Sequence, residues 1–158
     1  MEEIERVFFN SLEETCKNLK INEQTAFLED KFTGITRTRT TAELCSAMIK
    51  MHKLKKRDYK DTIKKITNWL LSKQNPDGSW NETHVNYDNS SSVFTAICGL
   101  TLLEVCEEFS DIKISKEVLD NTAKFLLDQE LKNGHFKKSE QITKSKRGRS
   151  ELYKTSKI

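Results

Sequence analysis

Two segments of the sequence repeat each other at a spacing of 56 residues, and this repeat limits the fold more than any other feature. Residues 69–80 read WLLSKQNPDGSW, and residues 125–136 read FLLDQELKNGHF. In both, an aromatic residue and two leucines open the segment, and a glycine stands two places before a closing aromatic residue. Repeats of about 50 residues are typical of stacked supersecondary units that cannot bury their apolar faces alone. The repeat therefore predicts helical units that pack side by side.

Apolar residues at three- and four-residue spacing predict helices upstream of the first copy. They indicate an amphipathic helix over residues 2–20 and another over residues 41–55. A short helical turn is expected at residues 26–28, and Gly34 marks a break. No segment alternates in the way that a half-buried strand does. The prediction is an all-α fold.

Helix signals also precede each repeat segment. Asp58 is expected to cap the helix that stops at the turn of residues 75–78. Residues 90–109 are apolar on most sides, which predicts a buried helix. Ser115 is expected to cap the last helix, which ends at residues 132–134. Residues 41–45 also align with residues 94–98 at a spacing of 53, which extends the repeat to the preceding helices.

The first copy fits a known motif at five positions, and the second copy keeps part of it. The order of aromatic, aliphatic, glutamine, glycine and tryptophan resembles the QW motif of squalene–hopene cyclases, and the following polar loop and apolar helix resemble the repeats of protein prenyltransferase β-subunits. The resemblance implies an α,α-toroid, in which antiparallel helix pairs stack so that their inner helices line a central cavity. The positions are Trp69, Leu70, Gln74, Gly78 and Trp80 in the first copy, and Phe125, Gly134 and Phe136 in the second, where Glu130 replaces the glutamine.

The motif residues are expected to have structural roles. Gly78 and Gly134 follow helix ends, where the chain reverses through a left-handed conformation that glycine adopts at little cost. Gln74 is placed to bond carbonyl groups of its own helix end or of the next helix. Trp80 can pack on a neighbouring repeat and bury a large area. The closing aromatic residue is therefore interpreted as part of the packing rather than as a ligand platform.

The catalytic residues that the resemblance implies are not in this sequence. The cyclases use a DxDD motif and the prenyltransferases a zinc site with a D-x-C motif, and neither motif occurs here. Asp77, His84, Asp88 and Cys98 are zinc-ligand types, but their spacing follows no known scheme. We therefore prefer solvated turn residues and a core cysteine over a metal site. No catalytic residue, metal or cofactor is predicted.

The domain prediction separates a helical-repeat domain, residues 1–136, from a basic tail, residues 137–158. The tail carries eight basic and two acidic residues, a net charge of +6, whereas residues 1–136 carry −3. The tail could contact phosphates of nucleic acid or an anionic membrane face, or remain solvated, which is the more common fate of such runs. It could also begin a further repeat, because residues 150–153 stand where the next inner helix would start.

Length makes a partial toroid the expected architecture. In the families that the chain resembles, a closed toroid takes about six helix pairs, and this chain has room for roughly three units. Either the chain is part of an interrupted or truncated toroid, or another subunit or a partner protein covers the open edges, or the chain is a compact bundle that borrows the repeat. A non-catalytic interaction or scaffold module is the preferred function. The alternatives are an isoprenoid-binding enzyme or subunit completed by oligomerisation, and a nucleic-acid-associated protein that uses residues 137–158. No transmembrane span or signal peptide is predicted, and the expected location is cytoplasmic.

Overall fold

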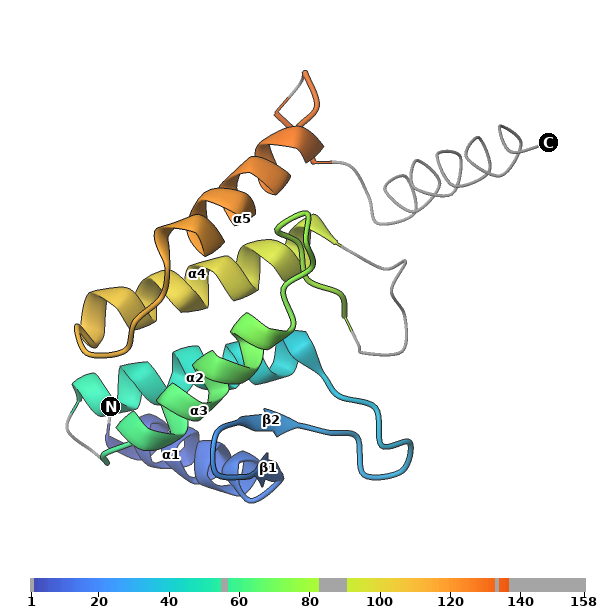
Figure 1. Ribbon diagram of the computed structural model, residues 1–158. Coiled ribbons are helices and arrows are strands. Elements are labelled where there is room, and N and C mark those ends of the chain that lie inside the picture. The colour runs from blue at the N-terminus through green and yellow to red at the C-terminus, as the bar shows by residue number, and fades with distance from the viewer. Residues whose placement is uncertain (1, 55–56, 83–90, 133, 137–158) are drawn as a thin grey trace.

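The computed structural model describes residues 2–54, 57–82, 91–132 and 134–136, and this part of the chain is mostly helical (Figure 1). Two helical hairpins, α2 with α3 and α4 with α5, follow an N-terminal helix and a small sheet. None of the described helices is both long and apolar enough to cross a lipid bilayer. The helices are α1 (Glu2–Cys16), α2 (Thr38–Lys53), α3 (Lys60–Ser72), α4 (Ser92–Glu108) and α5 (Lys116–Gln129).

The segment between α1 and α2 forms an antiparallel sheet of two strands, β1 (Leu19–Ile21) and β2 (Ala26–Leu28). The predicted helical turn at residues 26–28 is therefore wrong, whereas the mostly helical character of the described residues agrees with the all-α prediction at a coarse level. The reason lies in the connecting turn, where the Asn22 side-chain oxygen accepts the N–H groups of Gln24 (2.9 Å) and Thr25 (2.7 Å). Such a side-chain bond competes with helix formation and reverses the chain.

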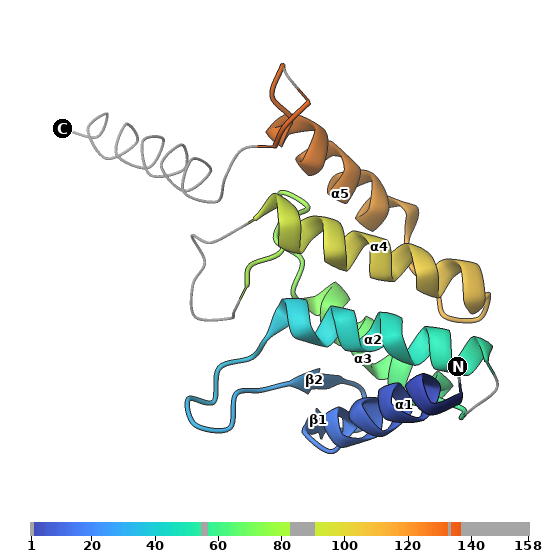
Figure 2. The ribbon, with the colours of Figure 1, turned by 180° about the vertical axis from the view of Figure 1, so that it is seen from behind.

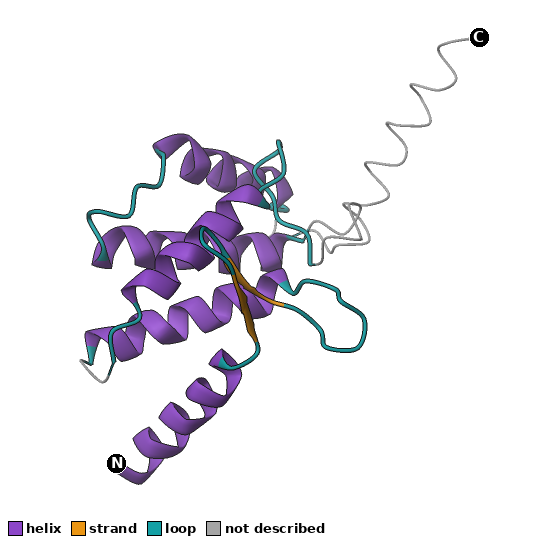
Figure 3. Ribbon diagram, turned by 60° about the horizontal axis from the view of Figure 1, so that its bottom comes forward, coloured by secondary structure: helices purple, strands orange, loops and turns teal. Residues whose placement is uncertain are grey.

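Strand β2 packs against α2 and α3, and Figure 3 shows the two orange strands lying across the helices. Ala26 and Leu28 point into the core, and Phe27 on the other face stacks on Trp69 of α3, with ring centroids 5.3 Å apart. Helix α1 therefore ends at Cys16 instead of residue 20, and residues 19–20, which the sequence pattern assigned to this helix, belong to β1.

Helices α2 and α4 run side by side and in parallel, and α3 and α5 lie against them (Figures 1 and 2). At their C-terminal ends, the Lys53 ammonium group lies 3.3 Å from the Glu108 carboxylate. Further along, the Thr101 hydroxyl donates to the Ala42 carbonyl oxygen (3.3 Å) and lies 3.0 Å from the Ser46 hydroxyl. Both views place α1 at one end of the stack and the α4–α5 hairpin at the other.

The core lies between α2, α3 and α4. Burial of apolar side chains from these helices is the main force that holds the hairpins together, and it contributes roughly 25 cal/mol per Å² of buried apolar surface. The largest fully buried apolar side chains are Trp80, Met48, Ile49, Ile63, Ile66, Leu70, Leu102 and Val105.

Helix α4 is buried on one side only, so the prediction that it is buried all round is wrong. Val93, Leu100 and Leu103 are 58%, 60% and 46% exposed, whereas Leu102 and Val105 are fully buried. Apolar residues surround the helix, but α2, α3 and α5 cover only part of its circumference.

The four cysteines have different environments. Cys45 and Cys98 are fully buried, and burial raises the pKa of both thiols well above its ordinary value. Cys16 is half-buried, and Cys106 on α4 is exposed. Cys106 is therefore not part of the packed core.

Candidate functional site

The two repeat segments form the same hydrogen-bonded turn. In the first copy, the Asn75 N–H donates to the Ser79 carbonyl oxygen (2.8 Å), and the Gly78 N–H donates to the Asn75 carbonyl oxygen (2.9 Å). The same two bonds recur 56 residues later, at 2.6 and 2.8 Å. Gly78 and Gly134 have φ angles of +83° and +77°, a region in which glycine carries no β-carbon penalty. The sequence repeat is therefore a repeat of backbone geometry.

Gln74 joins the end of α3 to α5. Its side-chain amide nitrogen donates to the carbonyl oxygen of Gly78 (3.2 Å) within its own turn. The same nitrogen lies 3.1 Å from the Val118 carbonyl oxygen and 3.0 Å from the Thr122 hydroxyl oxygen, both in α5. One half-buried amide therefore links α3 to α5, the second helices of the two hairpins.

Trp80 joins α3 to α4. The side chain is fully buried, and its indole N–H donates to the Leu70 carbonyl oxygen (2.9 Å) at the end of α3. Its backbone N–H donates to the Thr95 hydroxyl oxygen (3.1 Å) in the first turn of α4. A buried indole usually finds such a partner because an unpaired N–H is costly. Trp80 is thus part of the packing, as expected.

A second threonine repeats the contact that Thr95 makes. In the first turn of α2, the Thr41 hydroxyl oxygen accepts the backbone N–H of Leu28 (2.9 Å). Both threonines are fully buried. This shared contact aligns α2 with α4 at a spacing of 54 residues, one more than the spacing of 53 inferred from the sequence.

The remaining motif residues divide into a packed group and an exposed one. Trp69, Leu70 and Phe125 are buried, so the aromatic residue that opens each copy is a core residue. The residue that closes the second copy, Phe136, is 49% exposed, in contrast to the buried Trp80. The described part of the chain contains no further helix over Phe136 of the kind that α4 provides over Trp80.

The polar cluster of Asp77, His84, Asp88 and Cys98 is not assembled by the described residues. The Asp77 carboxylate accepts the backbone N–H (3.1 Å) and the hydroxyl group (2.5 Å) of Ser79, which is a turn contact. Cys98 lies in the core. His84 and Asp88 lie outside the described residues, as does the basic tail of residues 137–158. Within the described ranges, no three His, Cys, Asp or Glu side chains form a group that could hold a metal ion.

An exposed apolar surface covers the outward side of α4. We name it the α4 stripe, and its members follow one another at intervals of three, four and three residues. This is the spacing of one helix face and of a helix–helix seam. Acidic residues Glu104 and Glu107 flank the last turn of the stripe, and on the neighbouring α5, Leu127 is also largely exposed. The stripe consists of Val93, Ala96, Leu100 and Leu103.

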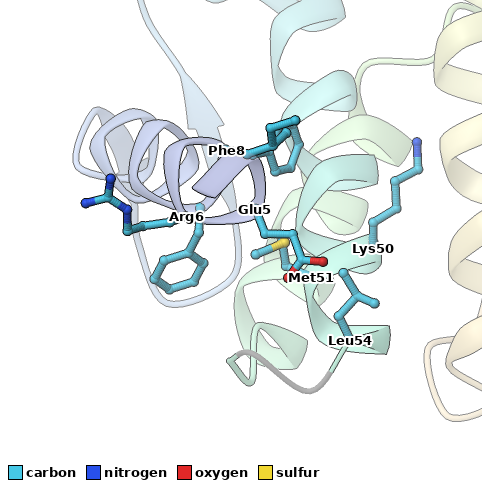
Figure 4. Close-up of a pocket in the computed structure, with 8 residues that line it drawn as sticks. Glu5, Arg6, Phe8, Lys50, Met51 and Leu54 are labelled. Carbon is cyan, nitrogen blue, oxygen red and sulfur yellow. The ribbon is translucent and has the colours of Figure 1, made fainter. Parts of the chain in front are cut away.

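A groove lies at the opposite end of the stack, between α1 and the C-terminal half of α2. We name it the α1 groove; its volume is about 630 Å³ and its lining is mostly apolar. Figure 4 shows Glu5 of α1 lying beside Met51 of α2 and Leu54, the residue that follows α2. The residues that line it are Ile4, Glu5, Arg6, Phe8, Phe9, Lys50, Met51 and Leu54. Sequence reasoning missed both surfaces, although the three–four–three spacing within α4 was a signal for the stripe.

No family model, no curated protein and no solved structure matches this chain.

Proposed function

We propose that this chain is a helical-repeat interaction or scaffold module, built as a partial α,α-toroid of the prenyltransferase and terpenoid-cyclase type. In this arrangement α2 and α4 are the inner helices, and α3 and α5 are the outer helices. The parallel course of α2 and α4 and the contact of Gln74 with α5 support it, together with the repeated turn.

The observation that carries the interaction role is the α4 stripe. Large apolar side chains in a continuous helical row are usually covered, and an exposed row of this kind marks a surface for another macromolecule. Phe136 and Leu127 add exposed apolar side chains on the same hairpin. A repeat stack ends in such a face wherever no further unit covers it. We infer that the α4–α5 end of the stack receives a helical partner.

A second candidate function is the binding of an isoprenoid chain, by an enzyme or subunit that oligomerisation completes. The α1 groove favours it, because its volume and apolar lining suit a flexible hydrocarbon. Lys50 at the groove could pair with a diphosphate, although Glu5 also lines it.

Two measurements distinguish these functions: dye binding reports whether the α4 stripe is exposed, and ligand titration reports whether the chain binds an isoprenoid. We expect Leu100→Glu to reduce binding of the apolar dye bis-ANS and to leave the melting temperature close to that of the wild-type chain. Phe32→Glu is the matched control, because Phe32 is almost fully exposed and lies outside both surfaces. Calorimetric titration with farnesyl diphosphate tests the second candidate. A large fall in melting temperature for Leu100→Glu, or saturable farnesyl diphosphate binding, would refute the interaction role as the main function.

A further inference from the structure

We propose that the α4 stripe of one copy of this chain docks into the α1 groove of a second copy, so that copies associate head to tail. The inference rests on the proposed interaction role and names its partner. The stripe of one copy then fills the groove of the next, so a single contact covers both apolar surfaces.

The stripe and the groove lie on opposite sides of α2, so one chain cannot join its own two surfaces. Ala42 of α2 accepts a hydrogen bond from Thr101 of α4. Met51, which lines the groove, follows Ala42 by nine residues, or about two and a half helical turns, and therefore points the opposite way. Figures 1 and 2 likewise place α1 and α4 on opposite sides of α2.

The two surfaces also match in shape and in apolar character. The stripe is a ridge on a single helix, and the groove is a hollow between two helices. Ile4, Phe8 and Leu54 of the groove each leave more than half of their surface exposed. An apolar face of one helix laid into a hydrophobic groove is a recurring mode of recognition. Burial of both surfaces removes exposed apolar side chains at the two ends of the stack from water.

The rims of the two surfaces carry one pair of opposite charges. Exposed Glu107 follows Leu103 of the stripe by one further turn of α4, so this end of the stripe carries an acidic side chain. At the groove, Lys50 of α2 supplies a basic side chain and Glu5 an acidic one, whereas Arg6 forms an ion pair with Glu3 of its own helix. Opposite charges at the rim of an apolar contact favour the correct orientation of the two partners.

Two other occupants of the stripe explain less. The tail of residues 137–158 contains four large apolar residues, Ile142, Leu152, Tyr153 and Ile158, which is little apolar surface for an apolar helix face. Pairing of α4 with α4 of a second copy would cover the stripe but leave the α1 groove open. A head-to-tail contact covers both surfaces, and contacts of this kind form rings when the rotation closes and filaments when it does not.

The test is sedimentation of the full chain over a wide range of concentrations, with two variants that each block one surface. Leu100→Glu blocks the stripe, Phe8→Glu blocks the groove, and Phe32→Glu is the control. We expect the wild-type chain and the control to associate with rising concentration, and each blocking variant alone to stay monomeric. A mixture of the two blocking variants retains one intact stripe and one intact groove. It should therefore form a one-to-one dimer and nothing larger.

Several results would overturn this inference. A wild-type chain that stays monomeric would refute head-to-tail association. If that monomeric chain bound farnesyl diphosphate and the Phe8→Glu variant did not, the groove would be a ligand site instead. Continued dimerisation of Phe8→Glu would indicate pairing of α4 with α4. Circular dichroism checks the folding of each variant, and Leu103→Glu with Leu54→Glu provides a second pair. If the wild-type chain is monomeric but its stripe binds bis-ANS, only the identity of the partner as a second copy is refuted. If the stripe of the monomeric chain does not bind the dye, the proposed interaction role is refuted as well.

Discussion

Gly78 lies so close to Asn121 that a β-carbon on the glycine would be 2.2 Å from the Asn121 carbonyl oxygen. The turn after α3 therefore packs directly on the backbone of α5. Its counterpart in the second copy, Gly134, has a similar φ angle, but a β-carbon there would have no atom of the described residues within 4 Å beyond its own chain neighbours. The two glycines share a conformation and differ in their surroundings.

This pair separates backbone strain from packing. Gly134→Ala should cost about 1–2 kcal/mol of the free energy of unfolding, because only the left-handed conformation resists the β-carbon. Gly78→Ala should cost about 1–3 kcal/mol more, since the turn must also move away from α5. Urea unfolding of both variants measures the difference, and equal losses would mean that the close approach to Asn121 does not exist.

Replacement of Gln74 tests the link between α3 and α5. Gln74→Ala removes a half-buried amide that contacts Val118 and Thr122, and leaves the Val118 carbonyl oxygen without this donor. We expect a loss of about 1–3 kcal/mol in the free energy of unfolding. Gln24→Ala is the control, since Gln24 is exposed and such surface changes stay within about 0.5 kcal/mol. If both variants were equally stable, the link would be energetically unimportant.

Two leucines of α4 report which side of the helix is packed. Leu102→Ala should lower the free energy of unfolding by about 2–5 kcal/mol, because the side chain is fully buried. Leu100→Ala should change it by no more than about 0.5 kcal/mol in dilute, monomeric protein. Thermal and urea unfolding at low concentration provide the comparison. A large loss from Leu100→Ala would instead support a helix that is buried all round.

The loop between β2 and α2 should lose stability in acid through Asp30. The backbone N–H and the hydroxyl of Thr33, the N–H of Phe32 and the Arg37 guanidinium group lower the pKa of Asp30 to about 2. Because this pKa lies below the unfolded value of about 3.9, the ionised carboxylate stabilises the folded loop above about pH 4. That contribution is lost as the pH falls towards 2.

Amide hydrogen exchange at Thr33 and Gly34 measures this loop directly. Protection should decrease between about pH 4 and 2, after correction for the intrinsic rates, and Asp30→Asn should remove most of that pH dependence. An unchanged profile in Asp30→Asn would show that another group controls the loop.

Thiol labelling should distinguish the cysteines by burial. DTNB should modify exposed Cys106 rapidly in the native protein. Cys45 and Cys98 should react only on unfolding, because burial both blocks access and raises the pKa of each thiol. Cys106→Ser should abolish the fast phase. A fast phase that persisted in this variant would have to come from the half-buried Cys16 or from an opening of the core.

Sequence reasoning predicted what local chemistry determines and failed where tertiary packing decides. The turn glycines, the linking role of Gln74 and the burial of Trp80 follow from backbone and hydrogen-bonding requirements that are visible in the motif. The strand at residues 26–28 was missed because the side chain of Asn22 and the hydroxyl of Thr41 organise it, and Thr41 is distant in sequence.

Helix α4 shows a different limit. Apolar residues occur on all its sides, so the sequence has no polar side to show which part neighbours leave open. The exposure of Leu100 beside the burial of Leu102 depends on where α2, α3 and α5 lie. The α1 groove is likewise lined by two groups of residues that lie more than 40 positions apart in the sequence. No local sequence pattern therefore predicts it.

The hydroxyl oxygens of Thr41 and Thr95 each accept the backbone N–H of the segment that leads into their own helix, so the same hydrogen bond occurs at the start of α2 and of α4. A chain in which this hydrogen bond recurs can lengthen by duplication of one hairpin, because the duplicate carries both the turn and the threonine hydroxyl that its neighbours require. Its two terminal surfaces would stay the same whatever the number of hairpins. Evolution could thus alter the span and curvature of the protein while preserving what each end recognises.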